Sequence, residues 1–342
     1  MRNFDKIALL VFLAGFIGLS ALIAGCGNPK SSARIVCTTG MVRDVVQTLV
    51  GTNETVVALM GSGVDPHLYD PLGPDIAALN SAEIVFYTGL HLEGKMGELL
   101  EDLEKKGKTV VAVGEAIPEN LLIKEGGGAK DFDPHVWMSV STWTEIIDPV
   151  LDTLSKAQPG KADAFGANAA ALRAELAAFG ANSAALRAEL AELDGYVKKC
   201  IGAIPPDARI LITAHDAFAY FGRDYGLEVE GIQGISTDDE AGLERINELV
   251  DLLVTRKIPA VFVESTVPPK HVAALIEGAK SKGHDVRIGG ELFSDAMGAD
   301  GSYEGTYLGM IDHNATIISR ALGGADAAPE KGRTGKLSGE QK

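Results

Sequence analysis

Three histidines and one aspartate stand in four short segments whose composition suits metal binding. The segments are Gly63–His67, Asp133–Trp137, Thr213–Phe218 and Glu291–Met297, and the side chains of interest are His67, His135, His215 and Asp295. Imidazole nitrogens and carboxylate oxygens are common ligands of zinc and other divalent transition metals. A histidine on its own is more often a hydrogen-bonded core or surface residue. Four donors together predict one metal site, provided that the fold brings them together.

The elements expected just before these residues favour such a meeting. His67 follows an expected strand at residues 55–60, His215 follows one at 209–213, and Asp295 follows one at 286–288. In open α/β sheets, ligands bind at the carboxyl ends of the strands. The first half of the chain supplies two imidazoles, and the second half supplies an imidazole and a carboxylate. A cleft between two lobes would let all four converge.

Strand-like and helical patterns alternate on both sides of a long helical middle. We expect strands at residues 33–38, 55–60, 83–88, 109–113, 209–213, 228–232, 260–263 and 286–288, and helices at 41–50, 74–79, 95–106, 219–225, 243–256 and 271–282. Strands separated by helices of this length are typical of parallel sheets covered by helices. The fold class is therefore α/β with two lobes, at residues 34–158 and 205–322, joined by a long helical segment at 159–204.

The joining helix contains a direct internal repeat. Phe165–Ala178 and Phe179–Glu192 are nearly identical units of 14 residues. Apolar or small residues recur through both units in alternating steps of four and three, so they form one continuous seam. A unit of this length extends a helix by about 21 Å and rotates its face by only about 40°. The repeat is thus an insertion that a helix tolerates well.

The first 33 residues predict export and a lipid anchor. Arg2 and Lys6 precede an apolar run at residues 7–23, and small residues stand before Cys26, which is the pattern of a secretory signal. Because the cysteine resembles a lipobox cysteine, we expect a signal peptide at 1–25, lipidation of Cys26 and a tether at 26–33. The alternative is an uncleaved anchor helix, since the run is barely long enough to span a bilayer.

Composition limits the possible partners and the cysteine chemistry. The formal net charge of −16 disfavours nucleic acid and is mainly a solubility feature. Besides Cys26 only Cys37 and Cys200 occur; one disulfide is possible, but two separate buried thiols are favoured. Residues 323–342 are small, charged and rich in glycine, with one proline, which predicts a disordered tail.

The four metal-ligand segments, with Gly89–Glu93 and Gly290–Gly298, resemble those of the zinc/manganese solute-binding lipoproteins of ABC transporters, the cluster A-I group. The resemblance covers nearly the whole mature chain. It implies two α/β lobes joined by one rigid helix, with His67, His135, His215 and Asp295 as the metal ligands. It also implies a monomer at the outer face of a membrane or in the periplasm, working with an ABC permease and its ATPase. The repeat departs from the usual length of the family's helix, so the resemblance does not define how that helix packs against both lobes.

Zinc is the leading metal, with manganese also plausible. Three imidazoles suit Zn²⁺, whereas Mn²⁺ prefers more oxygen. Manganese-dedicated members of the family carry glutamate where His215 stands. The stretch at 115–131 lacks the histidine-rich loop of many zinc members, which weakens a dedicated zinc-scavenging role.

Supporting roles are expected for two acidic residues. Asp216 is interpreted as the cap of the helix that follows it, or less favourably as a group that orients a ligand. Glu264, at the end of a strand, is a candidate for hydrogen bonding a ligand imidazole. The Asp-Pro pairs before His67 and His135 fix the chain there, as ordinary turns also would. The other histidines, which are His91, His271, His284 and His313, are interpreted as structural or exposed.

Two other function classes are open on the residues alone. In a zinc hydrolase, three imidazoles would hold a zinc-bound water and Asp295 would act as a base. No HExxH helix or Ser/His/Asp constellation supports that class, so we expect no enzyme activity. A surface adhesin or metal sensor is the third class, because lipid-anchored binding proteins are exposed at the cell surface.

Overall fold

The computed structural model describes residues 35–52, 54–125, 131–157, 165–238 and 241–337, with the side chains of 165–177 and 179 left aside. The signal, Cys26 and the tether lie outside the described residues. Within the described part of the chain, no helix is both long and apolar enough to cross a membrane.

The first lobe is built on a parallel four-stranded sheet with the order β2-β1-β3-β4. Its strands are β1 Ile35–Cys37, β2 Val56–Ala58, β3 Ile84–Tyr87 and β4 Thr109–Ala112, and its first helices are α2 Gly40–Val50, α3 Gly73–Ser81 and α4 Gly97–Lys105. The central strand β1 is buried along its whole length, as expected for a parallel strand covered on both faces. Two further helices, α5 Val140–Thr144 and α6 Ile147–Lys156, complete this lobe.

The second lobe contains two parallel strand pairs, β5-β6 and β7-β8, and β5 also contacts β7. The strands are β5 Ile210–Thr213, β6 Glu228–Gly231, β7 Ala260–Glu264 and β8 Arg287–Leu292, and the helices are α8 Ala219–Tyr225, α9 Leu243–Arg256, α10 Lys270–Ser281 and α11 Tyr307–Ala321. Short 3-10 helices occur at η1 Gly94–Met96, η2 Gly114–Ala116, η3 Glu119–Leu121, η4 Val136–Met138 and η6 Pro206–Ala208. The predicted fold class, two α/β lobes with parallel strands, is confirmed.

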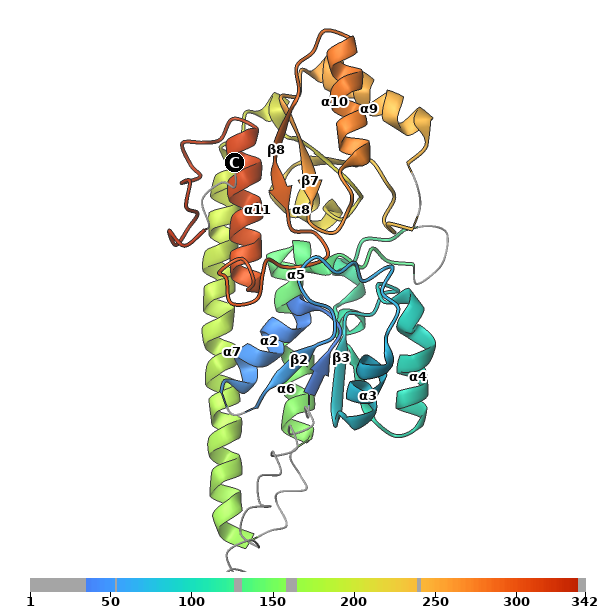
Figure 1. Ribbon diagram of the computed structural model, residues 1–342. Helices are drawn as coiled ribbons and strands as arrows, with labels where there is room; N and C mark the ends of the chain where they lie inside the picture. Colours follow the sequence, from blue (N-terminus) through green and yellow to red (C-terminus); the bar gives the residue numbers. More distant parts are fainter. Residues whose placement is uncertain (1–34, 53, 126–130, 158–164, 239–240, 338–342) are drawn as a thin grey trace, which may run out of the picture. The chain divides into compact units, whose positions relative to one another are not determined.

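A single helix of 38 residues, α7 Phe165–Gly202, runs beside both lobes (Figure 1). Its C-terminal half packs through buried Leu186, Leu190, Leu193 and Val197. These side chains belong to one apolar core that also includes residues of β1, α2, α8 and α11. The lobes therefore share a core along α7, and two smaller clusters fill the outer parts of the individual lobes.

The two copies of the repeat occupy successive parts of α7. In the second copy, the Asn182 side chain donates a hydrogen bond to the Leu49 carbonyl, 2.9 Å, and Arg187 pairs with Asp148 of α6 at 2.5 Å. The helix backbone continues through the first copy, and in Figure 1 this end of α7 extends past α2 and β2. The second copy thus contributes two polar contacts between the helix and the first lobe.

Three helices and the C-terminal segment differ from the sequence-based expectations. Helices α5, α6 and α11 were not predicted. In α11, four polar side chains are buried and interrupt the apolar stripe, namely Asp312, Asn314, Thr316 and Ser319. The predicted disordered tail from residue 323 is ordered through Leu337. There Ala328 is fully buried, and the Arg333 backbone N–H donates to Asp312 Oδ1 at 2.9 Å. Both described cysteines are buried free thiols, as expected.

Candidate metal centre

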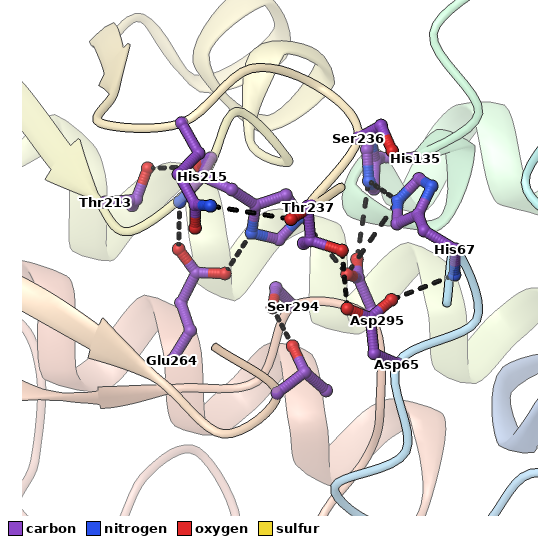
Figure 2. A network of polar contacts seen from close by, with 12 residues as sticks. Asp65, His67, His135, Thr213, His215, Ser236, Thr237, Glu264, Ser294 and Asp295 are labelled. Carbon is purple, nitrogen blue, oxygen red and sulfur yellow. Dashed lines mark hydrogen bonds and ion pairs between the residues drawn. The ribbon is translucent and has the colours of Figure 1, made fainter. Parts of the chain in front are cut away.

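The four predicted ligands meet in one buried cluster (Figure 2). His67 lies in the loop after β2, His135 directly precedes η4, His215 follows β5 and Asp295 follows β8. One ligand atom from each of the four lies within 4.8 Å of all the others. Because each lobe contributes two of them, the site exists only while the lobes are held together.

The ring Nε2 atoms of the histidines surround the carboxylate of Asp295. His135 Nε2 is 3.4 Å from Asp295 Oδ1, and His215 Nε2 is 3.1 Å from Oδ2. His67 Nε2 lies 3.9 Å from the same Oδ2 and 3.3 Å from His135 Nε2. Within the part of the chain that the structure describes, the His215 Nε2 atom and both Asp295 oxygens are buried without a hydrogen bond of good geometry. Buried polar atoms of this kind require a partner, and a divalent cation at their centre would satisfy all of them.

The two Asp-Pro-His sequences form the same local turn. The His67 backbone N–H donates to Asp65 Oδ1 at 2.9 Å, and the His135 backbone N–H donates to Asp133 Oδ1, also at 2.9 Å. An aspartate that accepts from the backbone two residues later is an Asx turn, and the proline between them limits the backbone further. Each histidine is therefore presented from a rigid turn.

Two carboxylates orient the rings of the buried histidines through Nδ1. Glu264, at the end of β7, contacts His215 Nδ1 at 2.5 Å and accepts from the His215 backbone N–H at 2.9 Å. Asp133 contacts His135 Nδ1 at 2.8 Å. A carboxylate at Nδ1 directs the Nε2 lone pair toward the metal and makes it more basic. The ring contact of Asp133 was missed in the sequence; the Asp-Pro-His pattern was its signal, but it was interpreted only as a turn.

The pKa is lowered for one of the three histidines and raised for the other two, which lie beside carboxylates. Burial lowers the pKa of His67 to about 4, so its ring is neutral near pH 7. Burial alone would also lower the pKa of His135, but Asp133 and Asp295 raise it to about 9. Despite burial, Glu264 and Asp295 raise the pKa of His215 well above its usual value. Burial opposes the charged form of Asp295, yet His215 and His135 hold its pKa well below the usual range.

The loop that carries Asp295 is held from both lobes. Trp137, two residues after His135, donates its indole N–H to the Ser294 carbonyl at 2.8 Å. On the other side, the Asn314 side chain of α11 both accepts from the Phe293 N–H at 3.0 Å and donates to the Phe293 carbonyl at 2.7 Å. Neither contact was predicted, because both join residues that are far apart in sequence. They fix the backbone immediately before the ligand.

Asp216 and the histidines outside the cluster make other contacts. Asp216 does not cap α8; the N-cap residue is Phe218, without a side-chain cap, and the Asp216 backbone N–H donates to Gly234 at 3.3 Å. His284 and His313 use Nε2 to contact the carbonyls of Ile258 and Glu291. They are structural, as the sequence indicated, and His91 is exposed.

A cavity of about 430 Å³ leads from the surface to His67. Its walls come from both lobes and include Lys95, Asp131 and Phe132 on one side and Ile235, Ser236 and Asp238 on the other. His67 is also the most accessible of the four ligands. His67 is thus the member of the cluster that lines this cavity.

This fold and this site define a two-lobed α/β protein with a buried His₃Asp centre between the lobes. The family model described as "Zinc-uptake complex component A periplasmic" matches residues 35–181 and 177–321. The chain therefore belongs to this family. The two matches join at 177–181, where the first copy of the repeat meets the second.

Individual relatives are similar over most of their length. The chain is 45% identical to the manganese-binding lipoprotein MntA of Bacillus subtilis over 91% of this chain and 98% of that protein. It is 42% identical to the zinc-binding protein TroA of Treponema pallidum over 84% of this chain and 88% of that protein. The solved structure of the periplasmic zinc-binding protein TroA superimposes with a TM-score of 0.77, covering 84% of this chain and 98% of that one.

Proposed function

We propose that this chain is the extracytoplasmic solute-binding protein of a metal ABC importer. It captures Zn²⁺ or Mn²⁺ between its lobes and delivers the ion to a membrane permease driven by an ATPase. The observation that carries the proposal is the convergence of four buried donor atoms, two from each lobe, within 4.8 Å. His67, His135, His215 and Asp295 bind the ion, with Glu264 and Asp133 orienting two of the rings.

Zinc is the preferred ion in this proposal, and manganese is a second cargo. Three imidazole nitrogens and a carboxylate suit Zn²⁺ better than Mn²⁺, which favours oxygen donors. Asp295 reduces this preference for Zn²⁺ over Mn²⁺, because both of its carboxylate oxygens lie among the histidines. One oxygen is 3.4 Å from His135 Nε2 and the other is 3.1 Å from His215 Nε2, and oxygen donors favour Mn²⁺. Relatives of nearly equal identity are named for each metal, which supports a site that accepts both.

We also place the protein outside the cytoplasm, as a monomer anchored by lipid on Cys26 after removal of residues 1–25. The basic start, apolar run and small residues before Cys26 support this assignment. The name of the Bacillus subtilis relative, a lipoprotein, also supports it. Several lipid chains on one cysteine hold a protein at a membrane more firmly than a single chain does.

The alternatives predict different outcomes. A hydrolase needs an open position on the metal and a free base, whereas here Asp295 stands between the histidines as a fourth donor. We propose that the chain binds its ion without turnover. Genetic neighbours that encode a permease and an ATPase would separate import from adhesion or sensing.

Metal analysis and ligand substitution test the proposed site directly. Purified protein should bind one divalent ion per chain, and alanine at any of the four ligand positions should weaken Zn²⁺ binding by at least about tenfold. His271→Ala in α10 is the matched control and should leave the dissociation constant unchanged. Competition with a chromogenic chelator gives the constants. A control variant as impaired as His135→Ala would contradict the ligand assignment.

A further inference from the structure

One segment of the second lobe connects the surroundings of two metal ligands. This segment, Gly231–Asp238, is here called the strap. Its base is held by backbone hydrogen bonds on both sides of His215: Gln233 N–H donates to Ala214 O at 3.0 Å, and Asp216 N–H donates to Gly234 O at 3.3 Å. Gly231 allows this close approach, since a Cβ there would lie 2.6 Å from Asp216 N.

The far end of the strap contacts the first lobe. The Thr237 hydroxyl donates to Asp65 Oδ2 at 2.5 Å, while Asp65 Oδ1 accepts from the His67 backbone N–H at 2.9 Å. A single carboxylate therefore joins the turn that presents His67 to a segment whose base surrounds His215 (Figure 2). A hydrogen bond to a carboxylate is among the stronger ones in proteins.

Fewer contacts hold the His67 ring in place than hold the rings of the other two histidines. His135 and His215 are fully buried, and each has a carboxylate at Nδ1. Among the described residues, His67 is held by its backbone bond to Asp65 and by the Nε2 contact with His135. Ile235, Ser236 and Asp238 of the strap line the cavity that leads to His67. The strap is thus both a wall of the entrance and a tether for the ligand behind it.

We propose that the Thr237–Asp65 hydrogen bond is an interlobe latch that sets how long the bound ion stays. The latch holds His67 against the second lobe while the ion is bound, and its opening lets His67 withdraw as the first ligand to leave. Thr237 is a positioning residue, which acts on the ion through Asp65 and His67. This inference rests on the proposed metal-binding function and adds to it a residue that controls release.

The test measures Zn²⁺ release and capture separately. Stopped-flow mixing of the Zn²⁺-loaded protein with excess chelator gives the dissociation rate, and mixing of metal-free protein with Zn²⁺ gives the association rate. Thr237→Val, which removes only the hydroxyl, should raise the dissociation rate about tenfold, equivalent to about 1.4 kcal/mol. The association rate should change by less than about twofold, because interface changes act mainly on dissociation. Thr237→Ser keeps the hydroxyl and should behave as the unmodified protein.

Further variants make the result specific. Thr153→Val removes a hydroxyl that bonds the Pro149 carbonyl within α6, and it should leave both rates unchanged. Thr237→Ala should accelerate release as valine does, which covers the case in which valine does not fit. In an Asp65→Ala background, Thr237→Val should add little, since residues that act as one unit are not additive.

The outcomes separate the two proposals. If the unmodified protein binds no Zn²⁺, the proposed function fails and the latch fails with it. If binding stays at one ion per chain and Thr237→Val and Thr237→Ala both release it at the unmodified rate, the latch alone is overturned. The latch is also overturned if Thr237→Ser accelerates release as much as valine, or if only the association rate changes.

Discussion

At the scale of single residues, burial and three carboxylates have opposite effects on the pKa values of the site histidines. Asp133, Glu264 and Asp295 are buried beside two histidines whose pKa values they raise. A buried negative charge is costly unless it is paired. In the metal-free protein the pairing charges are imidazolium rings, and in the loaded protein they are the ion. Two protons can thus be exchanged for one divalent cation with no change in the charge of the site.

This exchange predicts proton release on metal binding. Since the pKa of His135 is about 9 and that of His215 is also raised, both rings are protonated at pH 7. An ion must displace the Nε2 proton from each, so Zn²⁺ binding at pH 7 should release about two protons. His67 should contribute none, because its pKa is about 4. The apparent affinity should therefore fall steadily as the pH is lowered from about 9.

Calorimetry in buffers of different ionisation enthalpy counts these protons. Asp133→Asn removes a carboxylate that raises the pKa of His135, so this variant should release about one proton fewer at pH 7. Release of no protons by the unmodified protein at that pH would contradict the charge exchange. An affinity that stays flat between pH 7 and pH 5 would contradict coordination by His135 and His215.

Metal choice is also decided by individual residues. His215→Glu would replace a nitrogen donor by a harder oxygen and should lower the ratio of Zn²⁺ to Mn²⁺ affinity. In that variant the new carboxylate would lie beside Glu264, which contacts the His215 ring at 2.5 Å. The two negative charges would repel each other and weaken the site. The pair His215→Glu with Glu264→Gln avoids the repulsion and should shift the ratio toward Mn²⁺ with less loss of total affinity. Competition titration with both metals checks this, and an unchanged or increased ratio for the pair would refute it.

At the scale of elements, α6 and α7 explain how the repeat is accommodated. The two helices run side by side in opposite directions (Figure 1), and the pair Arg187–Asp148 joins them. The end of α6 lies eight residues after Asp148, and Phe179 lies eight residues before Arg187. At 1.5 Å per residue, both points are about 12 Å from the pair. The second copy therefore begins level with the end of α6, and the first copy is the part that extends beyond.

Deleting Phe165–Ala178 should leave metal binding nearly unchanged. Asn182 and Arg187, which contact the first lobe, remain, as does Leu186 of the shared core. Because Phe179 is level with the end of α6, residues 158–164 then need to span only a short distance. We expect a Zn²⁺ dissociation constant within about threefold of the unmodified value and a nearly unchanged melting temperature. Calorimetry and thermal denaturation provide the two measurements.

The reciprocal deletion, Phe179–Glu192, is a matched control. Asn168, Leu172 and Arg173 would take the places of their counterparts, so the binding constant should again be preserved. Ala178 would replace Glu192, which pairs with Arg333 at 3.3 Å, and an exposed pair of this kind contributes about 0–1 kcal/mol. If either folded deletion variant lost metal binding, the extra turns would have to separate the lobes, and this account of α7 would fail.

At the scale of the whole described molecule, the shared core restricts how the lobes move. Residues of α2 in the first lobe and of α8 and α11 in the second belong to one apolar cluster with α7. Polar contacts reinforce it: the Tyr220 hydroxyl donates to the Asp133 carbonyl at 2.9 Å and accepts from the Ile123 N–H at 3.0 Å. Wide opening of the lobes would break this packing. Metal release through a local change at His67 is compatible with it.

The local pattern of the sequence determined the element types and the kinds of donor. Alternating strands and helices indicated two parallel-sheet lobes, and the residue types of His67, His135, His215 and Asp295 indicated a transition-metal site. These features depend on short stretches of chain, in which periodicity and strand ends can be read directly. Helix α11 was not predicted from the sequence, because buried polar residues, including Asn314, interrupt its apolar face.

Contacts between distant segments were decided only by the tertiary structure. Glu264 reaches His215 across 49 positions, Thr237 reaches Asp65 across 172, and Trp137 reaches the Ser294 carbonyl across 157. The same is true of the order in the tail, which depends on Asp312 accepting from the Arg333 backbone. Such bonds depend on how the lobes and α7 pack, and no local pattern encodes their partners. The sequence by itself therefore determined which residues can hold an ion, whereas the packing determined their charges, their orientation and the latch.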